Sequence, residues 1–417
     1  MNPIKKIKAR VDSEGRLVFP PEVARRLGLT PESLISFDEE GLGLHLRPPA
    51  HRLAKVYIEP TNRCNLDCRI CIRNNWAEPL GEMSLETFSR VIEGLKAYSP
   101  VPTIFFGGLG EPLAHPQIAE MVARTRPLNC RVELITNGTL LTEELSMKLI
   151  RAGLNLLWVS IDGASPESYA DLRLGAALPE VLENVARFHR LTQKKPLSPP
   201  QIGIAFVAMK RNIEDLPLIL QIGNRLGAQH FLVSNVLPYT AEMCKESLYS
   251  LALADICYFP PIGGSHLKLP RMDLTDLTRE PLYRVLRGGL NGTLSCASGN
   301  WAKDRCPFIE QGVTAIRWDG AVSPCIPLLH TYTHYLNERE RLSKQYTIGN
   351  INEADLSVIW NSREYVSFRQ RVQDFEFSPC TLCGGCDLSR ENETDCFGNP
   401  FPTCGGCLWA QGVIQCP

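Results

Sequence analysis

The cysteines constrain this chain more than any other feature, because sixteen of its 417 residues are cysteine and most of them are clustered. Three fall between Cys64 and Cys71, and ten lie between Cys296 and Cys416. In a reducing compartment, clustered cysteines are metal ligands more often than disulfides. We therefore expect two metal-binding regions, and we interpret the three isolated cysteines as small buried hydrophobes: Cys130, Cys244 and Cys257.

Composition and charge indicate a globular protein of the cytoplasm. The 44 Lys and Arg residues nearly balance the 45 Asp and Glu residues, which argues against a chain built as a whole to coat nucleic acid or an anionic membrane. No apolar run approaches the roughly 18 residues that span a bilayer, and the charged start, Met1 to Gly15, has no apolar segment behind it. We expect no membrane partner.

Strand and helix patterns alternate from residue 54 onward, which predicts a parallel sheet in an α/β fold. Helices follow the first five predicted strands, with Ser84, Thr142 and Ser165 as expected N-caps. The expected architecture is a partial (β/α)6 barrel whose ligands sit at the carboxyl ends of the strands. The predicted strands are Val56 to Ile58, Thr103 to Phe106, Arg131 to Ile135, Leu156 to Ile161, Ile202 to Val207 and Phe231 to Val236.

Four domains or segments are expected along the chain. They are an N-terminal unit (1–48), the barrel (49–240), a connecting segment of weak pattern (241–295) and a Cys-rich tail (296–417). In the N-terminal unit, Ile4 to Val11 and Arg16 to Phe19 read as strands, Glu22 to Leu27 as a helix, and Leu34 to Phe37 pairs with Leu42 to Leu46 across an acidic turn, Asp38 to Gly41. The tail is poor in periodic segments, so we expect metal to hold it together.

The first three cysteines, Cys64, Cys68 and Cys71, form a C-x3-C-x2-C motif on the loop after the first barrel strand. Three thiolates can hold a 4Fe-4S cluster and leave one iron open to a substrate. A structural zinc site would need a fourth ligand from elsewhere in the chain, and this alternative stays open for the motif taken alone.

A glycine-rich turn with a carboxylate, Gly107 to Pro112, follows the second strand. Glycines let backbone groups approach a ligand closely, and the carboxylate of Glu111 can receive an ammonium group. The turn is not a dinucleotide fingerprint, because Leu113 stands where the third glycine would be. An ordinary glycine-rich turn is the alternative.

The cysteine motif followed by GGxGEP resembles the radical S-adenosylmethionine (SAM) superfamily. The resemblance implies that Cys64, Cys68 and Cys71 are the catalytic ligands of a 4Fe-4S cluster whose open iron binds SAM. Two further matches are Thr136-Asn137-Gly138 and Ser160-Ile161-Asp162-Gly163, after the third and fourth strands. By the same resemblance, the residues that contact SAM are Gly107, Gly108 and Glu111 at its amino group, Ser160 and Asp162 at its ribose, Arg173 at its carboxylate, and Asn137.

The implied chemistry is one-electron reduction of the cluster, cleavage of SAM and hydrogen abstraction by a 5'-deoxyadenosyl radical. Such chemistry needs a low-potential cluster in a dry barrel. It also needs an electron donor, such as a ferredoxin or a flavodoxin.

The tail resembles the SPASM extension of radical SAM enzymes that modify peptides and proteins, which carries two auxiliary 4Fe-4S clusters. Cys306 and Cys325 flank Gly320 at the family's spacing, whereas the nine residues between Cys386 and Cys396 depart from it. Our division assigns Cys306, Cys325 and Cys396, with Cys296 as a further candidate, to the first cluster. The ligands that it assigns to the second cluster are Cys380, Cys383 and Cys386, with one of Cys404, Cys407 or Cys416. A zinc ribbon is the alternative, because Cys380-x2-Cys383 and Cys404-x2-Cys407 have its spacing.

The segment from Asn392 to Gly412 resembles radical SAM maturases associated with tungsten-containing aldehyde ferredoxin oxidoreductases. A maturase of this kind would act on a pterin-type cofactor or on the oxidoreductase polypeptide. A radical SAM enzyme that modifies a ribosomal peptide is an alternative with the same core. The aromatic and proline-rich residues of the segment have a simpler explanation as packing around a cluster.

Residues 4 to 47 resemble the SpoVT/AbrB swapped-hairpin domain, whose members dimerise and bind DNA. Residues 1 to 26 carry seven basic and three acidic side chains, an excess of +4, but Glu32, Asp38, Glu39 and Glu40 cancel most of this charge within the same unit. A DNA-binding regulator that senses redox state or SAM is therefore the second class of function. A homodimerisation or substrate-docking module is the use that we favour.

Overall fold

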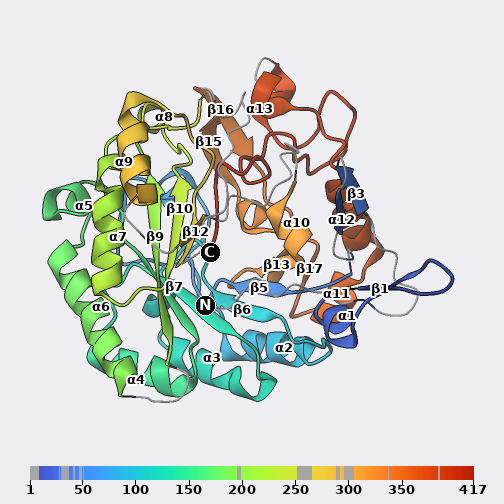
Figure 1. The fold of residues 1–417 in the computed structure, drawn as a ribbon, viewed down its shortest axis with the longest axis horizontal. Coiled ribbons are helices and arrows are strands. Elements are labelled where there is room, and N and C mark those ends of the chain that lie inside the picture. The colour runs from blue at the N-terminus through green and yellow to red at the C-terminus, as the bar shows by residue number, and fades with distance from the viewer. Residues whose placement is uncertain are drawn as a thin grey trace.

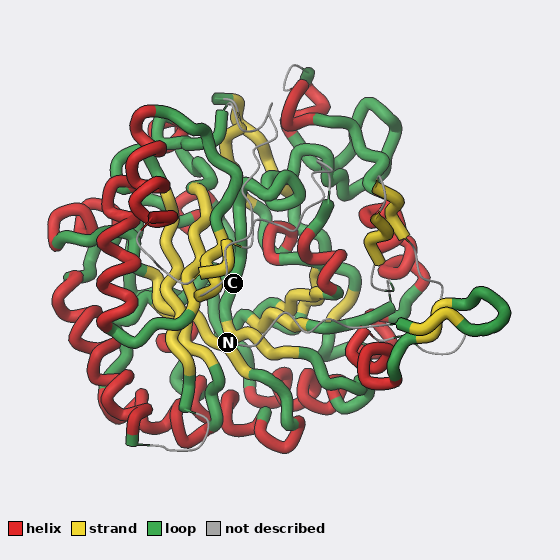
Figure 2. The backbone as a smooth tube through the Cα atoms, viewed as in Figure 1, coloured by secondary structure: helices red, strands yellow, loops and turns green. Residues whose placement is uncertain are grey.

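The computed structural model describes residues 9–27, 29, 37–40, 43–46, 49, 51–194, 199–250, 265–287, 292–294, 305–336, 338–383 and 386–417. A twisted sheet lies at the centre, with helices along its outer side (Figures 1 and 2). Among the described residues, no helix has the length and apolar character needed to cross a membrane.

The six predicted barrel strands form and pair in chain order, all parallel, with each end within one residue of its prediction. Strand β8 is buried along nearly its whole length, as expected for a parallel sheet covered on both faces. The partial α/β barrel is thereby confirmed. Its strands are β5 (Lys55–Ile58), β6 (Thr103–Phe106), β7 (Val132–Thr136), β8 (Leu156–Ser160), β9 (Gln201–Ala208) and β10 (His230–Asn235).

The sheet extends beyond the six predicted strands at both edges. After β10, the parallel order continues through β11 (Ser265–Lys268) and β12 (Gly292–Leu294), which lie in the segment expected only to connect. At the other edge, the tail strand β13 (Val313–Ile316) pairs in parallel with β5, followed by the antiparallel β14 (Ala321–Ser323) and β17 (Gly349–Asn350). The tail therefore shares the sheet and core of the barrel and does not rely on metal alone.

The helices that cover the sheet begin where the sequence predicts. The hydroxyls of Ser84, Thr142 and Ser165 each accept a bond from a backbone N–H in the first turn, and so cap α2, α4 and α5. The helices of the barrel region are α2 (Leu85–Leu95), α3 (Ile118–Arg124), α4 (Glu143–Ala152), α5 (Pro166–Leu172), α6 (Leu178–Gln193), α7 (Leu216–Arg225), α8 (Ala241–Cys244) and α9 (Asp276–Arg287).

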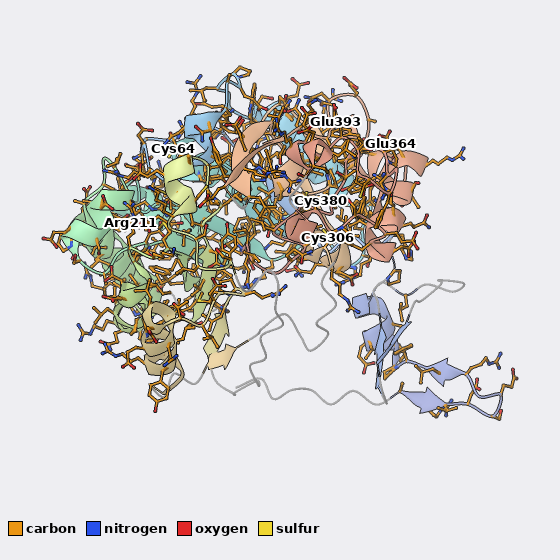
Figure 3. The ribbon with its side chains drawn as sticks, turned by 90° about the horizontal axis from the view of Figure 1, so that it is seen from above. Cys64, Arg211, Cys306, Glu364, Cys380 and Glu393 are labelled. Carbon is orange, nitrogen blue, oxygen red and sulfur yellow. The ribbon has the colours of Figure 1, made fainter. Side chains whose placement is uncertain are left out.

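The N-terminal strands project from the body of the molecule (Figures 1 and 3). Strand β1 (Arg10–Val11) pairs with β2 (Leu17–Val18), and α1 (Pro21–Leu27) follows. The predicted acidic turn is wrong in part, because Asp38 to Glu40 belong to β3 (Phe37–Glu40), which pairs with β4 (Gly43–Leu46). The ladder between these two strands includes the pair Glu40 and Gly43.

The end of the tail contacts the barrel strands. Its last residues turn back into the sheet, where Asn235 of β10 donates to the Val413 carbonyl and Lys55 of β5 donates to the Pro417 carbonyl at 2.6 Å. The remaining tail elements are α10 (Pro307–Gln311), β15 (Tyr332–Leu336), β16 (Arg339–Ser343), α11 (Leu356–Trp360), α12 (Arg363–Asp374) and α13 (Cys380–Cys383).

Candidate functional site

The three-cysteine loop leaves the carboxyl end of β5 and is held against the end of α5. The Arg69 and Asp67 amides donate to the carbonyls of Leu172 and Leu174 at 3.0 and 3.3 Å. Cys68 is buried, whereas Cys64 and Cys71 are half-buried. The fold thus places the three thiols at the carboxyl ends of the strands, where parallel α/β folds bind ligands.

The glycine-rich turn after β6 packs directly on this loop. A Cβ atom at Gly108 would stand 2.6 Å from Cγ of Glu59, and one at Gly110 would stand 2.6 Å from the Arg63 carbonyl oxygen. A side chain at either position would therefore push the two strand ends apart. The glycines permit a close approach between two loops of the chain itself, and Gly107 is similarly enclosed by Phe105 and Ile135.

Glu111 is buried and joins the ends of two strands. Its carboxylate accepts hydrogen bonds from Thr136 Oγ1 at 2.7 Å and from the amides of Asn137 and Leu113 at 2.7 and 3.0 Å. Burial raises the pKa of Glu111, although these hydrogen bonds oppose the shift. The expected role of Glu111 at the SAM amino group stays a prediction, since the observed partners belong to this chain.

Asp162 and Arg173 form a buried ion pair. Oδ2 of Asp162 accepts from Nε and Nη2 of Arg173 at 2.7 and 2.5 Å, and Oδ1 accepts from the Val207 amide at 2.8 Å. Ser160 lies half-buried at the end of β8. The two charged residues expected to contact different parts of SAM are thus each other's partners in this structure.

Two hydrogen-bond donors face the thiols of the first motif. Nη1 of Arg173 lies 4.0 Å from Sγ of Cys68, and Nδ2 of Asn137 lies 3.9 Å from Sγ of Cys64. A thiolate-bound iron cluster carries negative charge on its sulfurs, which such donors stabilise. The residues present therefore fit a cluster at this loop.

Four tail cysteines converge on one cavity. Cys306 precedes α10, Cys325 follows β14, and Cys404 and Cys407 belong to a tight C-x2-C turn, yet all four line the same space. Burial raises the pKa of Cys404, and the neighbouring charges of Cys407 and Cys306 raise it further, which places these thiols near one another. A cavity between four thiols suits a multi-iron cluster better than one zinc ion, whose ligands would meet at a point.

A second set of cysteines lies around α13. Cys380 is half-buried, and the charge of Cys396 is among those that raise its pKa after burial. Cys383 is on the same short helix, and Cys386 follows it. Figure 3 shows Cys380 and Cys306 in the same part of the molecule, with Cys64 apart from both. Within the described residues, no three His, Cys, Asp or Glu side chains close on the position of a single metal ion.

The division of the tail cysteines expected from spacing differs from this arrangement. Cys396 lies beside Cys380, and Cys404 and Cys407 take the places beside Cys306 and Cys325. For Cys416, the indole of Trp409 donates to its sulfur at 3.3 Å, and its charge acts on Tyr57 and Tyr239 of the barrel. Cys257 and Cys296 lie outside the described residues.

A buried histidine that the sequence analysis did not single out links the barrel to the tail. Nε2 of His330 contacts both carboxylate oxygens of Glu59, at 2.9 and 3.1 Å, and Nδ1 bonds to Glu78. Glu59 also accepts from the Leu109 amide in the glycine-rich turn, and the ring of Trp76 packs on His330. No local motif marks His330, because its partners lie far away in the chain.

Comparison with known proteins identifies the class that this fold and these thiols define. Residues 58–219 match the radical SAM superfamily, and residues 306–387 match the SPASM iron-sulfur cluster-binding domain. The chain belongs to the radical SAM superfamily. It is an enzyme that uses SAM and a 4Fe-4S cluster, with auxiliary iron-sulfur clusters in its SPASM domain.

Two similar relatives extend along most of the chain. The tungsten-containing aldehyde ferredoxin oxidoreductase cofactor-modifying protein of Pyrococcus furiosus is 32% identical over 366 residues, which cover 87% of this chain and 96% of that protein. The PqqA peptide cyclase of Gluconobacter oxydans is 29% identical over 371 residues, 86% of this chain and 90% of that one. The AdoMet-dependent heme synthase of Methanosarcina barkeri, 32% identical over 181 residues, is matched over 43% of this chain and 50% of its own length.

Solved structures agree in fold. SuiB of Streptococcus suis, bound to its precursor peptide SuiA, superposes with a TM-score of 0.56 at 17% identity, covering 83% of this chain and 72% of SuiB. The anSMEcpe structure with bound AdoMet gives a TM-score of 0.51 at 17% identity, covering 81% of this chain and 88% of that one. At this identity the likeness extends to the fold alone.

His330 predicts a pH-dependent contribution to stability. Burial alone would lower its pKa, but the hydrogen bonds and charges of Glu59 and Glu78 outweigh burial and raise the pKa from 6.5 to about 9. The charged imidazolium thus favours the folded state, fully below pH 6.5, and this contribution is lost as the pH rises through about 9. We expect the melting temperature of the wild type to fall more steeply over this range than that of His330→Gln, measured anaerobically by calorimetry. Parallel pH profiles would contradict the assignment.

The two sets of tail cysteines predict additive iron losses. Replacing Cys404 and Cys407 by Ala should remove about four irons, and replacing Cys380 and Cys396 should remove another set of about four. The quadruple variant should then lose about eight, measured by iron analysis after anaerobic reconstitution. Cys130→Ala is the control and should keep all its iron. If both pairs served one cluster, the quadruple variant would lose no more than either pair.

Proposed function

We propose that this enzyme is a maturase that modifies a pterin-type cofactor or a polypeptide of a tungsten-containing aldehyde ferredoxin oxidoreductase. The observation that carries the proposal is the similarity to the Pyrococcus furiosus cofactor-modifying protein, which spans the barrel and the tail together. Because the match covers 87% of the chain, it extends beyond the barrel and includes part of the Cys-rich tail.

In this proposal, Cys64, Cys68 and Cys71 hold the 4Fe-4S cluster that binds SAM. When bound, the cluster supplies the electron that cleaves SAM to methionine and a 5'-deoxyadenosyl radical. Arg173 and Asn137 donate toward the Cys68 and Cys64 sulfurs, and Asp162 holds the Arg173 guanidinium in that orientation. Residues of the surrounding strand ends complete the SAM site: Gly107, Gly108, Glu111 and Ser160.

The auxiliary clusters are assigned to the two thiol sets. Cys306, Cys325, Cys404 and Cys407 hold the first, supported by the cavity that they share. Cys380, Cys383, Cys386 and Cys396 hold the second, supported by the proximity of Cys380 to Cys396. Electrons come from a small redox protein such as a ferredoxin or a flavodoxin.

Modification of a ribosomal peptide is the second candidate. The PqqA peptide cyclase matches this chain over nearly the same length as the first relative, at 29% identity. Both candidates require the same core chemistry, so the substrate alone distinguishes them.

The N-terminal unit, whose resemblance to SpoVT/AbrB domains is part of this proposal, serves dimerisation and substrate docking. Its hairpin exposes apolar side chains: 63% of Val11 and 48% of Leu17 are accessible. A unit this short buries too little surface to be stable alone, so pairing with a second copy would complete its core. The acidic side chains of residues 38–40 oppose the alternative role in DNA binding.

The core assignment predicts a specific loss. Replacing Cys64, Cys68 and Cys71 together by Ala should remove about four irons and abolish 5'-deoxyadenosine formation, while the tail clusters keep their visible absorbance. With SAM and a reductant under anaerobic conditions, the wild type should form 5'-deoxyadenosine and change the mass of an aldehyde ferredoxin oxidoreductase precursor or its pterin cofactor. A triple variant that still cleaves SAM would refute the core assignment. A wild type that modifies only a ribosomal peptide would favour the second candidate.

Removing the N-terminal unit predicts separate effects on assembly and on substrate. A variant that begins at His51 should sediment as a monomer, retain its iron and still cleave SAM, because every cysteine of both thiol sets and of the first motif follows the cut. It should modify its substrate poorly. A truncated protein that stays dimeric and fully active on substrate would remove this role. Tight, sequence-dependent DNA binding by the full chain at physiological salt would favour the regulator instead.

A further inference from the structure

Arg341 is a buried cation at the junction of the two tail thiol sets. It lies on β16, 7% exposed, and lines the cavity that Cys306, Cys325, Cys404 and Cys407 share. Its Nη1 donates to the Gly406 carbonyl oxygen at 3.3 Å. Among the described residues that line this cavity, Arg341 is the side chain with a permanent charge. Outside the lining, the charge of Arg371 also acts on Cys404 and lowers its pKa.

The C-x2-C turn is shaped around this guanidinium. A Cβ atom at Gly406 would collide with Nη1 and Nη2 of Arg341, and one at Gly405 would collide with the carbonyl oxygen of Ser378. Ser378 in turn contacts Sγ of Cys380 at 3.1 Å through its hydroxyl. The two glycines therefore let one turn pack between Arg341 on one side and the segment before the second thiol set on the other.

The charges around Arg341 come from both thiol sets. Burial lowers the pKa of Arg341, and the charges of Cys380 and Cys407 oppose this shift. Cys407 belongs to the first set and Cys380 to the second. The neighbouring His334 is neutral, because burial and the charge of Arg341 lower its pKa to about 3. The Arg341 guanidinium thus faces thiols of both sets, and His334 beside it adds no positive charge.

We propose that Arg341 is a positioning residue that acts as a shared countercharge for the two auxiliary clusters. The inference rests on the proposed assignment of the two thiol sets to two clusters. A fixed cation in a poorly polarisable interior stabilises the reduced, more negative state of each nearby cluster and raises its reduction potential. Because the same charge serves both clusters, its removal changes both potentials in the same direction.

The test is an anaerobic redox titration of the reconstituted full-length protein, followed by electron paramagnetic resonance. Arg341→Gln should shift the midpoint potentials of both auxiliary clusters to more negative values and leave that of the SAM-binding cluster unchanged. Arg341→Lys keeps the charge and should stay near the wild type. Arg339→Gln removes an equal charge from the exposed first residue of the same strand and should shift neither potential.

Each outcome decides between the alternatives. Unchanged potentials in Arg341→Gln, a shift of one auxiliary cluster only, or an equal shift in Arg341→Lys would overturn the shared countercharge. If Arg341→Gln loses iron, Arg341→Lys distinguishes the two explanations. Full iron and near-wild-type potentials in Arg341→Lys would support the role of charge. Iron loss in Arg341→Lys as well would assign Arg341 to folding alone. A wild type with fewer than two auxiliary clusters by iron analysis would instead refute the ligand assignment on which the inference rests.

Discussion

The parallel pairing of β5 with β13 positions both metal-binding regions at once. Strand β5 leads directly into the loop of Cys64, and β13 follows Cys306 and precedes Cys325. The ladder joins Lys55 to Val313 and Ile58 to Ile316, so the two segments run side by side in the same direction. A displacement of either strand would therefore change the distance between the first cysteine loop and the tail cavity, which makes this pair of strands the frame for any electron transfer between them.

The contacts above this ladder are unusually polar for a buried interface. His330 of the tail lies between Glu59, just after β5, and Glu78, beyond the first cysteine loop. Burying one such charge alone would be costly, but each member of this group has a partner of opposite charge. The group therefore favours one relative placement of barrel and tail, because a shift that separates the partners leaves charges buried without compensation.

Much of the barrel could be predicted from the sequence, because its information is local. Alternating strand and helix patterns, with a capping hydroxyl at Ser84 or Thr142, locate elements without knowledge of their neighbours. Strands β11 and β13 escaped prediction since their short, irregular segments become strands only by pairing with β10 and β5. The same reason explains the tail cysteines. Spacing alone does not tell whether Cys396 or Cys404 lies beside Cys306 and Cys325. The folded chain places Cys404 there and Cys396 beside Cys380.

The Asp162–Arg173 pair joins two residues that the sequence places at the SAM site. The motif resemblance assigned each of them to a different part of SAM, and the structure instead pairs them within the protein. A guanidinium has five N–H donors, and the two that bind Asp162 leave Nη1 directed toward the Cys68 sulfur. The ion pair thus restricts the guanidinium to one orientation, in which Nη1 faces the cysteine loop. Arg341 is arranged in a similar way in the tail. Its guanidinium is buried, donates to the Gly406 carbonyl and faces thiols of both sets. In both regions, a buried arginine whose side chain is fixed by the protein faces the sulfur atoms, so its favourable interaction with negative charge requires little rearrangement when an electron arrives.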